Sequence, residues 1–195
     1  MNRRQAVQQV AALLGGSVLG AQLFIQSGCN PIDTAKVAEA PAGTFFSADE
    51  ITLLDEITET IIPRTDTPGA KDAKVAEFMN VMVRDCYTKD DQKIFKDGLK
   101  KLQQLCKEKY RADFLRIDAA QRKAFINFIN SEELTYSKNK KKEEPAHYFR
   151  MLRELTLLGF FTSETGATKT LRYVSVPGRY DACMPYTPEE KAWAT

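Results

Sequence analysis

From Phe46 onward the chain consists of amphipathic stretches separated by short polar breaks. The first stretch opens with Ser47 and Glu50, which have the spacing of a capping box, and it stops before Pro63, which cannot continue a helix. Between these limits the apolar residues recur at helical spacing: Ile51, Leu54, Ile57 and Ile61. The pattern predicts a helix that begins at Ser47 and opens the folded domain.

Four further helices are predicted in the same way. The second runs from about Asp72 to Cys86, and the third begins at Thr88 and continues towards Tyr110. The fourth begins at the capping pair Asp118 and Gln121, and the fifth runs from Pro145 to Gly166, which we expect as its C-cap. Between these two helices, residues 131–145 are rich in lysine and acidic residues, which favours a mobile, solvated loop.

The C-terminal tail, residues 167–195, does not continue this pattern. It contains too many Pro, Gly and aromatic residues for a helix, and only residues 171–176 alternate weakly, as a strand would. We therefore predict an all-α fold for residues 46–195, with about five helices in a compact orthogonal or bundle-like domain and a long irregular tail. Such a tail either wraps its own domain or holds a partner, and we expect the part up to Pro177 to lie on the helices.

Residues 1–29 are typical of an export signal and predict an N-terminal signal helix. Arg3 and Arg4 precede an apolar run that is short for a membrane span of about 20 residues, and the pair resembles a twin-arginine signal. The sequence Ser27-Gly28-Cys29 resembles the end of a lipoprotein signal, which makes Cys29 the candidate for lipidation. An uncleaved anchor, another cleavage site and a buried N-terminal helix are the alternatives. Residues 30–45 are small and polar and predict a flexible tether.

The charge of the chain argues against a nucleic-acid partner. Its 28 basic residues fall to 26 when Arg3 and Arg4 are set aside with the signal, which equals the 26 acidic residues. A nucleic-acid-binding surface needs an excess of basic residues, and a neutral domain does not offer one.

The sequence contains few residues that could carry out catalysis. Its single histidine, His147, falls in the first turn of the fifth helix, where a surface or capping role is expected. The chain has no close-spaced Cys and His cluster for zinc, no glycine-rich phosphate loop, no haem-attachment motif and no nucleophile elbow. We therefore predict a non-catalytic protein without a metal or cofactor of its own.

Export to an oxidising compartment raises the question of disulfides. If Cys29 is lipidated, Cys86, Cys106 and Cys183 remain. Cys86 and Cys106 would lie roughly 27 Å apart along the third helix, at 1.5 Å per residue, which is too far for a bridge. We favour a bridge between Cys86 and Cys183, with three free thiols as the alternative.

Two stretches of the sequence reveal a family resemblance. The block Ile61–Met79, IIPRTDTPGAKDAKVAEFM, and the tail stretch Gly166–Cys183, GATKTLRYVSVPGRYDAC, together with the twin-arginine-like start, resemble the gluconate 2-dehydrogenase subunit 3 family. The resemblance covers roughly Phe46 to Trp193, and the turn block and the VPGRY segment are its most specific parts.

The resemblance implies a non-catalytic accessory subunit of a periplasmic, membrane-associated dehydrogenase complex. In such complexes a large FAD-dependent subunit of the glucose-methanol-choline type oxidises a sugar, sugar acid or polyol. Electrons then pass to a cytochrome subunit or another acceptor, so FAD and any haem are expected on the partner chains. The small subunit is expected to assist the folding and twin-arginine export of the large one, and the family carries no catalytic residues over to this chain.

An export signal on a small chain serves a folded partner only if the two chains dock before they cross the membrane. Stable docking needs an interface on the order of 1,600 Å², with aromatic side chains as its anchors. In the tail we expect these anchors to be Tyr173, Pro177, Arg179, Tyr180, Tyr186 and Trp193. Phe160 and Phe161 are further candidates, although we expect them mainly in the core. The alternative function is a stand-alone cell-envelope helical lipoprotein that acts as a binding or structural module.

Overall fold

The computed structural model describes residues 44–176, 178, 183, 185, 187, 188 and 190–194. The chain divides into two units, residues 1–43 and residues 44–195, and the description covers only the second. Arg3, Arg4 and Cys29 therefore lie outside the described residues. Within the described residues, no helix is long and apolar enough to cross a membrane.

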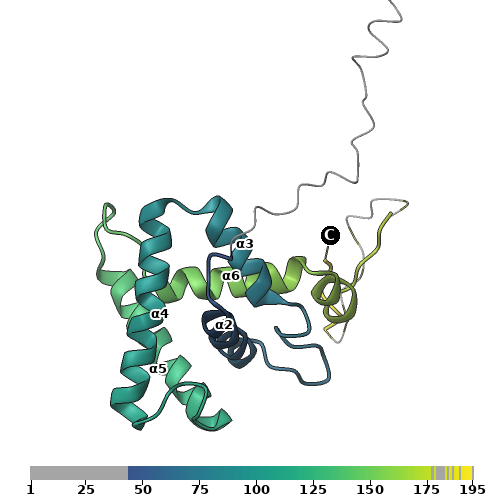
Figure 1. Cartoon of the computed structure of the whole chain (residues 1–195). Coiled ribbons are helices and arrows are strands. Elements are labelled where there is room, and N and C mark those ends of the chain that lie inside the picture. The colour runs from purple at the N-terminus through teal and green to yellow at the C-terminus, as the bar shows by residue number, and fades with distance from the viewer. Residues whose placement is uncertain are drawn as a thin grey trace, which may run out of the picture. The chain divides into compact units, whose positions relative to one another are not determined.

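The part of the chain that the structure describes contains five α-helices (Figure 1). They are α2 (Ala48–Ile61), α3 (Val75–Cys86), α4 (Lys89–Tyr110), α5 (Ala119–Asn139) and α6 (Tyr148–Thr162), followed by the short π-helix η2 (Gly166–Thr170). The described residues form no strand, and residues 171–176 contribute only one isolated bridge, from Arg172 to Trp193. The all-α prediction is confirmed.

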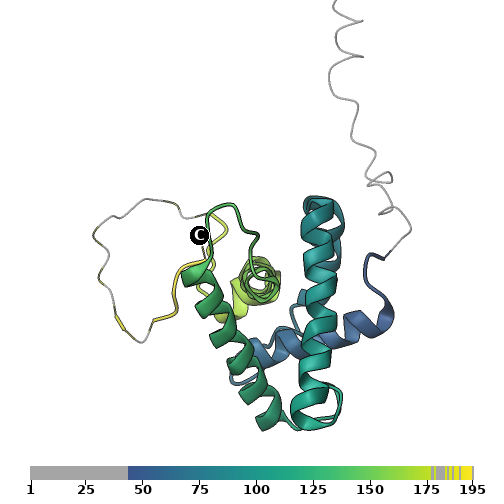
Figure 2. The same ribbon diagram turned by 90° about the vertical axis from the view of Figure 1, so that its left-hand side faces the viewer.

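Helix α6 lies at the centre of the domain and contacts each of the other four α-helices. Figure 2 shows it nearly end-on, between α5 and α4. It buries side chains on most of its circumference: Tyr148, Phe149, Met151, Leu152, Leu155, Thr156, Gly159 and Phe160. A helix that is apolar on nearly all sides is expected inside a domain, where other helices can cover it.

Two glycines allow neighbouring helices to approach one another closely. A Cβ atom at Gly98 of α4 would lie 2.2 Å from Cγ of Tyr148 on α6, and one at Gly159 of α6 would lie 2.6 Å from Cδ1 of Phe78 on α3. A larger residue would force either the contacting ring or the helix to move. The two crossings therefore depend on glycine for space rather than for backbone conformation.

The helix starts agree with the caps that the sequence predicts. Ser47 and Glu50 form the capping box of α2: the backbone N–H of Glu50 donates to Ser47 Oγ at 3.2 Å, and that of Ser47 donates to Glu50 Oε2 at 2.8 Å. Thr88 caps α4 through the N–H of Asp91, and Asp118 forms a capping box with Gln121 at the start of α5. These caps are local, so a single stretch of sequence is enough to predict them.

The loop predicted over residues 131–145 is wrong as far as Asn139, where α5 ends, whereas residues 140–145 do form a loop. Glu133, which resembles a surface residue in the sequence, is 1% exposed and forms an ion pair with Arg153 of α6 at 3.0 Å. Ser137 also donates a hydrogen bond to Glu133 at 2.7 Å. Arg153, the partner that holds Glu133 in the packed helix, lies 20 residues after it in the chain.

The limits of two other helices also differ from the prediction. Helix α3 begins at Val75 instead of Asp72, after Lys74 in the left-handed region (φ 52°). Helix α6 begins at Tyr148 and ends at Thr162, whereas Gly166 opens η2 and has no positive φ. Gly166 is therefore not a left-handed C-cap. A Cβ atom there would lie 1.9 Å from the carbonyl oxygen of Phe160, so this glycine permits a close backbone approach.

Candidate partner-docking surface

The second half of α6 carries large apolar side chains on its outer side. Leu157, Leu158 and Phe161 are 42%, 46% and 41% exposed, and their spacing places them along one side of the helix. We call these three residues the α6 stripe. They are exposed because the neighbouring helices cover the other sides of α6.

Phe160 and Phe161 have different environments although they are adjacent. Phe160 is 1% exposed, which confirms its expected place in the core, and its ring meets that of Phe161 edge-on with centroids 5.2 Å apart. The buried ring therefore supports the exposed one. Phe161 thus presents an apolar ring to solvent in the last turn of α6.

The end of α6 is joined tightly to the start of the tail. Ser163 donates from its hydroxyl to the carbonyl oxygen of Phe160 at 2.6 Å, and the same hydroxyl accepts from the N–H of Gly166 at 2.9 Å. The N–H of Leu171 then donates to the carbonyl oxygen of Gly166 at 3.1 Å and ends η2. Figure 1 shows η2 at the end of α6, with the described parts of the tail beside it. Helix η2, from which the tail continues, therefore lies directly after the α6 stripe.

The tail closes on itself at Arg172 and Trp193. The N–H of Arg172 donates to the carbonyl oxygen of Ala192 at 2.8 Å, and the N–H of Ala194 donates to that of Arg172 at 3.0 Å. The guanidinium group of Arg172 lies 4.1 Å from the centroid of the Trp193 ring, in a cation–π contact, and pairs with Glu190 at 3.4 Å. We call these contacts the tail clasp.

The described tail residues around the clasp are exposed to solvent. Tyr173 is 48%, Val176 79% and Trp193 44% exposed. Because residues 172–176 are all exposed, the expectation that the tail up to Pro177 lies on the helices is wrong for this segment. Its described backbone hydrogen bonds are made with the end of the tail instead.

Only part of the predicted docking set can be located. Trp193 belongs to the tail clasp, and Tyr173 directly follows the clasp residue Arg172 in the chain. Pro177, Arg179, Tyr180 and Tyr186 lie outside the described residues. The sequence analysis missed Leu157 and Leu158. Their signal was the apolar character of α6 on nearly every side, which leaves more apolar residues than the neighbouring helices cover.

The predicted disulfide is not formed in this structure. Cys86, at the end of α3, is an exposed free thiol whose Sγ lies 3.9 Å from Sδ of Met82. Cys106 is buried in α4, and burial raises the pKa of its thiol. Pairing of Cys86 with Cys183 stays a prediction.

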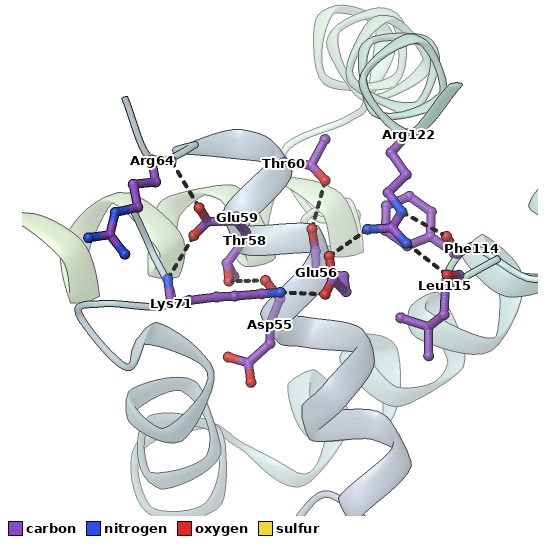
Figure 3. Close-up of polar contacts among 10 residues, drawn as sticks. All are labelled: Asp55, Glu56, Thr58, Glu59, Thr60, Arg64, Lys71, Phe114, Leu115 and Arg122. Carbon is purple, nitrogen blue, oxygen red and sulfur yellow. Dashed lines mark hydrogen bonds and ion pairs between the residues drawn. The ribbon is translucent and has the colours of Figure 1, made fainter. Parts of the chain in front are cut away.

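The turn block between α2 and α3 is held by two carboxylates of α2 (Figure 3). Glu59 accepts from the backbone N–H groups of Arg64 and Lys71, both at 2.9 Å. Glu56 forms ion pairs with Lys71 and, at 2.5 Å, with Arg122 of α5. These contacts connect the turn block with two helices, which indicates a structural role for its polar residues.

His147 is the N-cap of α6, which is one of the two roles expected from its position in the sequence. Its Nδ1 accepts from the N–H of Phe149 at 3.3 Å, and its ring lies between those of Tyr136 and Tyr148, with centroids 5.4 and 4.5 Å away. Burial lowers the pKa of His147. In the described part of the chain, no group of three or more His, Cys, Asp or Glu side chains is arranged to hold a metal ion.

Comparison with known families gives one match. A sequence profile described as gluconate 2-dehydrogenase subunit 3 matches residues 48–178, which span all five described α-helices, η2 and the first part of the tail. Neither the curated proteins nor the solved structures give a match.

Proposed function

Because this chain belongs to the gluconate 2-dehydrogenase subunit 3 family, we propose that it is the accessory subunit of a flavin-dependent dehydrogenase complex. The chain itself is non-catalytic in this proposal. The large subunit oxidises a sugar, sugar acid or polyol, and it carries the FAD. A cytochrome subunit with haem is a further candidate partner.

The α6 stripe is the observation that carries this proposal. Leu157, Leu158 and Phe161 expose apolar surface on the central helix of the domain, which η2 connects to the tail, where Tyr173 and Trp193 are also exposed. Contiguous exposed apolar surface marks interaction sites, and rigid aromatic side chains are common hot spots in them. We propose that the α6 stripe, Tyr173 and the clasp residue Trp193 dock the large subunit.

The N-terminal segment supports the remainder of the proposal. Arg3 and Arg4 would direct the chain, with its docked and folded partner, to twin-arginine export into the periplasm. Cys29, or the uncleaved signal, would then attach the complex to the membrane. In this arrangement the small chain assists the maturation, export and membrane association of a larger subunit.

Co-purification from the native host tests this proposal. We expect the chain to bring down a large flavoprotein under mild extraction, with flavin absorbance in the eluate. We expect Leu158→Ser combined with Phe161→Ser to lower the yield of that partner at least tenfold, because truncation of hot-spot residues commonly costs 2 kcal/mol or more. Recovery of the chain alone, without a flavoprotein, would show the proposal to be wrong.

A matched control separates docking from a general loss of solubility or fold. Leu134 on α5 is 46% exposed, as is Leu158, and it lies outside the α6 stripe. Leu134→Ser should leave the partner yield unchanged. If the stripe variant and this control retain the partner equally, docking occurs elsewhere on the molecule.

The alternative is a stand-alone cell-envelope lipoprotein that acts as a binding or structural module. In such a protein the tail clasp, whose contacts are all within this chain, would be the final arrangement of the tail. A stand-alone module predicts a monomer after mild extraction and no flavin band.

A further inference from the structure

The two ends of the C-terminal tail meet at one place on the domain. Arg172 exchanges the two backbone hydrogen bonds of the tail clasp with residues 192–194, and the ammonium group of Lys191 donates to the carbonyl oxygen of Lys169 in η2. Helix η2 contacts α6, so the clasp is built on the helical domain (Figure 1). The end of the chain therefore returns to the base from which the tail leaves.

The clasp joins the two ends of a stretch that carries most of the predicted docking residues. Residues 173–189 lie between its two halves in the sequence, and we call them the tail loop. Five of the six predicted docking residues belong to it: Tyr173, Pro177, Arg179, Tyr180 and Tyr186. The sixth, Trp193, is part of the clasp itself. Since tyrosine, tryptophan and arginine are the commonest hot-spot residues, the clasp controls how these side chains are presented.

The clasp, and not packing on the helices, holds the start of the tail loop. Residues 172–176 are exposed, and within the described part of the chain Arg172 alone among them makes backbone hydrogen bonds. The guanidinium group of Arg172 is occupied inside the clasp, by the Trp193 ring at 4.1 Å and by Glu190 at 3.4 Å. Arg172 is therefore placed to position the loop and not to contact a partner.

We propose that the tail clasp preforms the docking surface for the large subunit, by closing the tail loop before the partner binds. This inference rests on the proposed function. An open stretch of this length loses conformational freedom when its ends are brought together. A chain that is already closed does not lose that freedom on binding, so the apparent affinity rises with the fraction of closed chains. Arg172 acts as a positioning residue.

The fluorescence of Trp193 tests whether the clasp forms in solution. Trp193 is the only tryptophan of the chain, so acrylamide quenching of its emission in the isolated full chain reports on the clasp alone. Arg172→Ala removes the cation–π contact and the ion pair. Quenching should then become about twofold stronger, because the ring is 44% exposed within the clasp.

Lys169→Ala is the control for this measurement. Lys169 takes part in these contacts only through its backbone carbonyl, so the variant should be quenched as the wild type is. Equal quenching of Arg172→Ala and the wild type would show that the clasp does not hold Trp193 in solution, and the proposal would be wrong.

Recovery of the large subunit tests whether the closed loop matters for docking. Under mild extraction from the native host, Arg172→Ala should lower the yield of the flavoprotein about tenfold, since a cation–π contact and an exposed ion pair each favour the closed form a few-fold. Leu171→Cys combined with Ala192→Cys places a disulfide beside the bridge between Arg172 and Trp193. This disulfide, checked by peptide mapping, should restore the yield in the Arg172→Ala chain, and its reduction should remove the gain.

The outcomes separate this inference from the proposed function. If the wild type brings down no flavoprotein, the proposed function fails and the inference fails with it. If the wild type retains the partner and Arg172→Ala retains it equally, only the inference is wrong. If the oxidised disulfide does not restore the yield, Arg172 contacts the partner directly, which contradicts a positioning role.

Discussion

The N-cap of the central helix α6 depends on the ionisation state of His147. Its Nδ1 accepts the N–H of Phe149, which only the neutral imidazole can do. Burial is the main cause that lowers its pKa, with Lys101 acting in the same direction and Glu132 and Glu133 opposing it. The folded state therefore favours neutral His147.

Stability should consequently fall as the pH drops through the titration of His147. The pKa of an unfolded histidine is about 6.5, and the pKa of folded His147 lies below this value. Between these two pKa values the unfolded state binds more protons, so acid favours unfolding in this window, and the contribution of neutral His147 is fully present above it. Urea unfolding measured from pH 7.5 down to pH 5.5 should show this loss.

Two variants separate the cap from other titrating groups. His147→Asn keeps a capping acceptor that does not titrate, so its stability should depend less on pH than that of the wild type. His147→Ala should cost about 1 kcal/mol at pH 7.5, the usual size of a lost N-cap. Equal pH dependence of the wild type and His147→Asn would contradict the assignment.

At the scale of elements, the crossing of α4 and α6 depends on Gly98. A Cβ atom at this position would lie 2.2 Å from Cγ of the buried Tyr148 ring, so Gly98→Ala forces the two helices apart. We expect a loss of about 1–3 kcal/mol, the usual cost of overpacking, even though alanine is the better helix former. The free energy of unfolding in urea measures this effect.

Lys100→Ala provides the comparison within the same helix. Lys100 is exposed on α4, and its side chain reaches only Asp97 at 3.7 Å, so its removal should change stability by less than about 0.5 kcal/mol. If Gly98→Ala proves as stable as the wild type, the helices can shift at this crossing without a measurable cost.

The start of helix α5 could be predicted from the sequence, but its end could not. The cap at Asp118 fixes its beginning locally, and this start was predicted. Its last turns depend on Glu133, whose burial against Arg153 of α6 exists only once both helices have packed. A lysine- and glutamate-rich stretch has the same composition whether it is a solvated loop or a helix with one buried carboxylate.

At the scale of the whole molecule, the tail and the helical domain should be separable. The described tail residues 172–176 are exposed, and their described backbone hydrogen bonds are made within the tail. A chain truncated after Val176 should therefore keep its helical circular dichroism. It should fail to co-purify the large subunit, because it lacks Trp193 and the tail clasp.

The outcome of truncation distinguishes two roles of the tail. Loss of helical signal would show that the tail is needed for folding, whereas full retention of the partner would show that the tail is not part of the docking surface. Glu190→Gln, which removes one exposed ion pair of the clasp at 3.4 Å, should leave both folding and partner yield close to those of the full chain.

The sequence by itself determined the all-α class, the helix starts at Ser47, Thr88 and Asp118, and the family, because caps, helical periodicity and the turn block are properties of contiguous residues. The tertiary structure decided which side of each helix is covered. It exposed Leu158, buried Glu133 and brought α2, α5 and α6 together around a cavity. These features depend on contacts between residues far apart in the chain, and no local pattern records them.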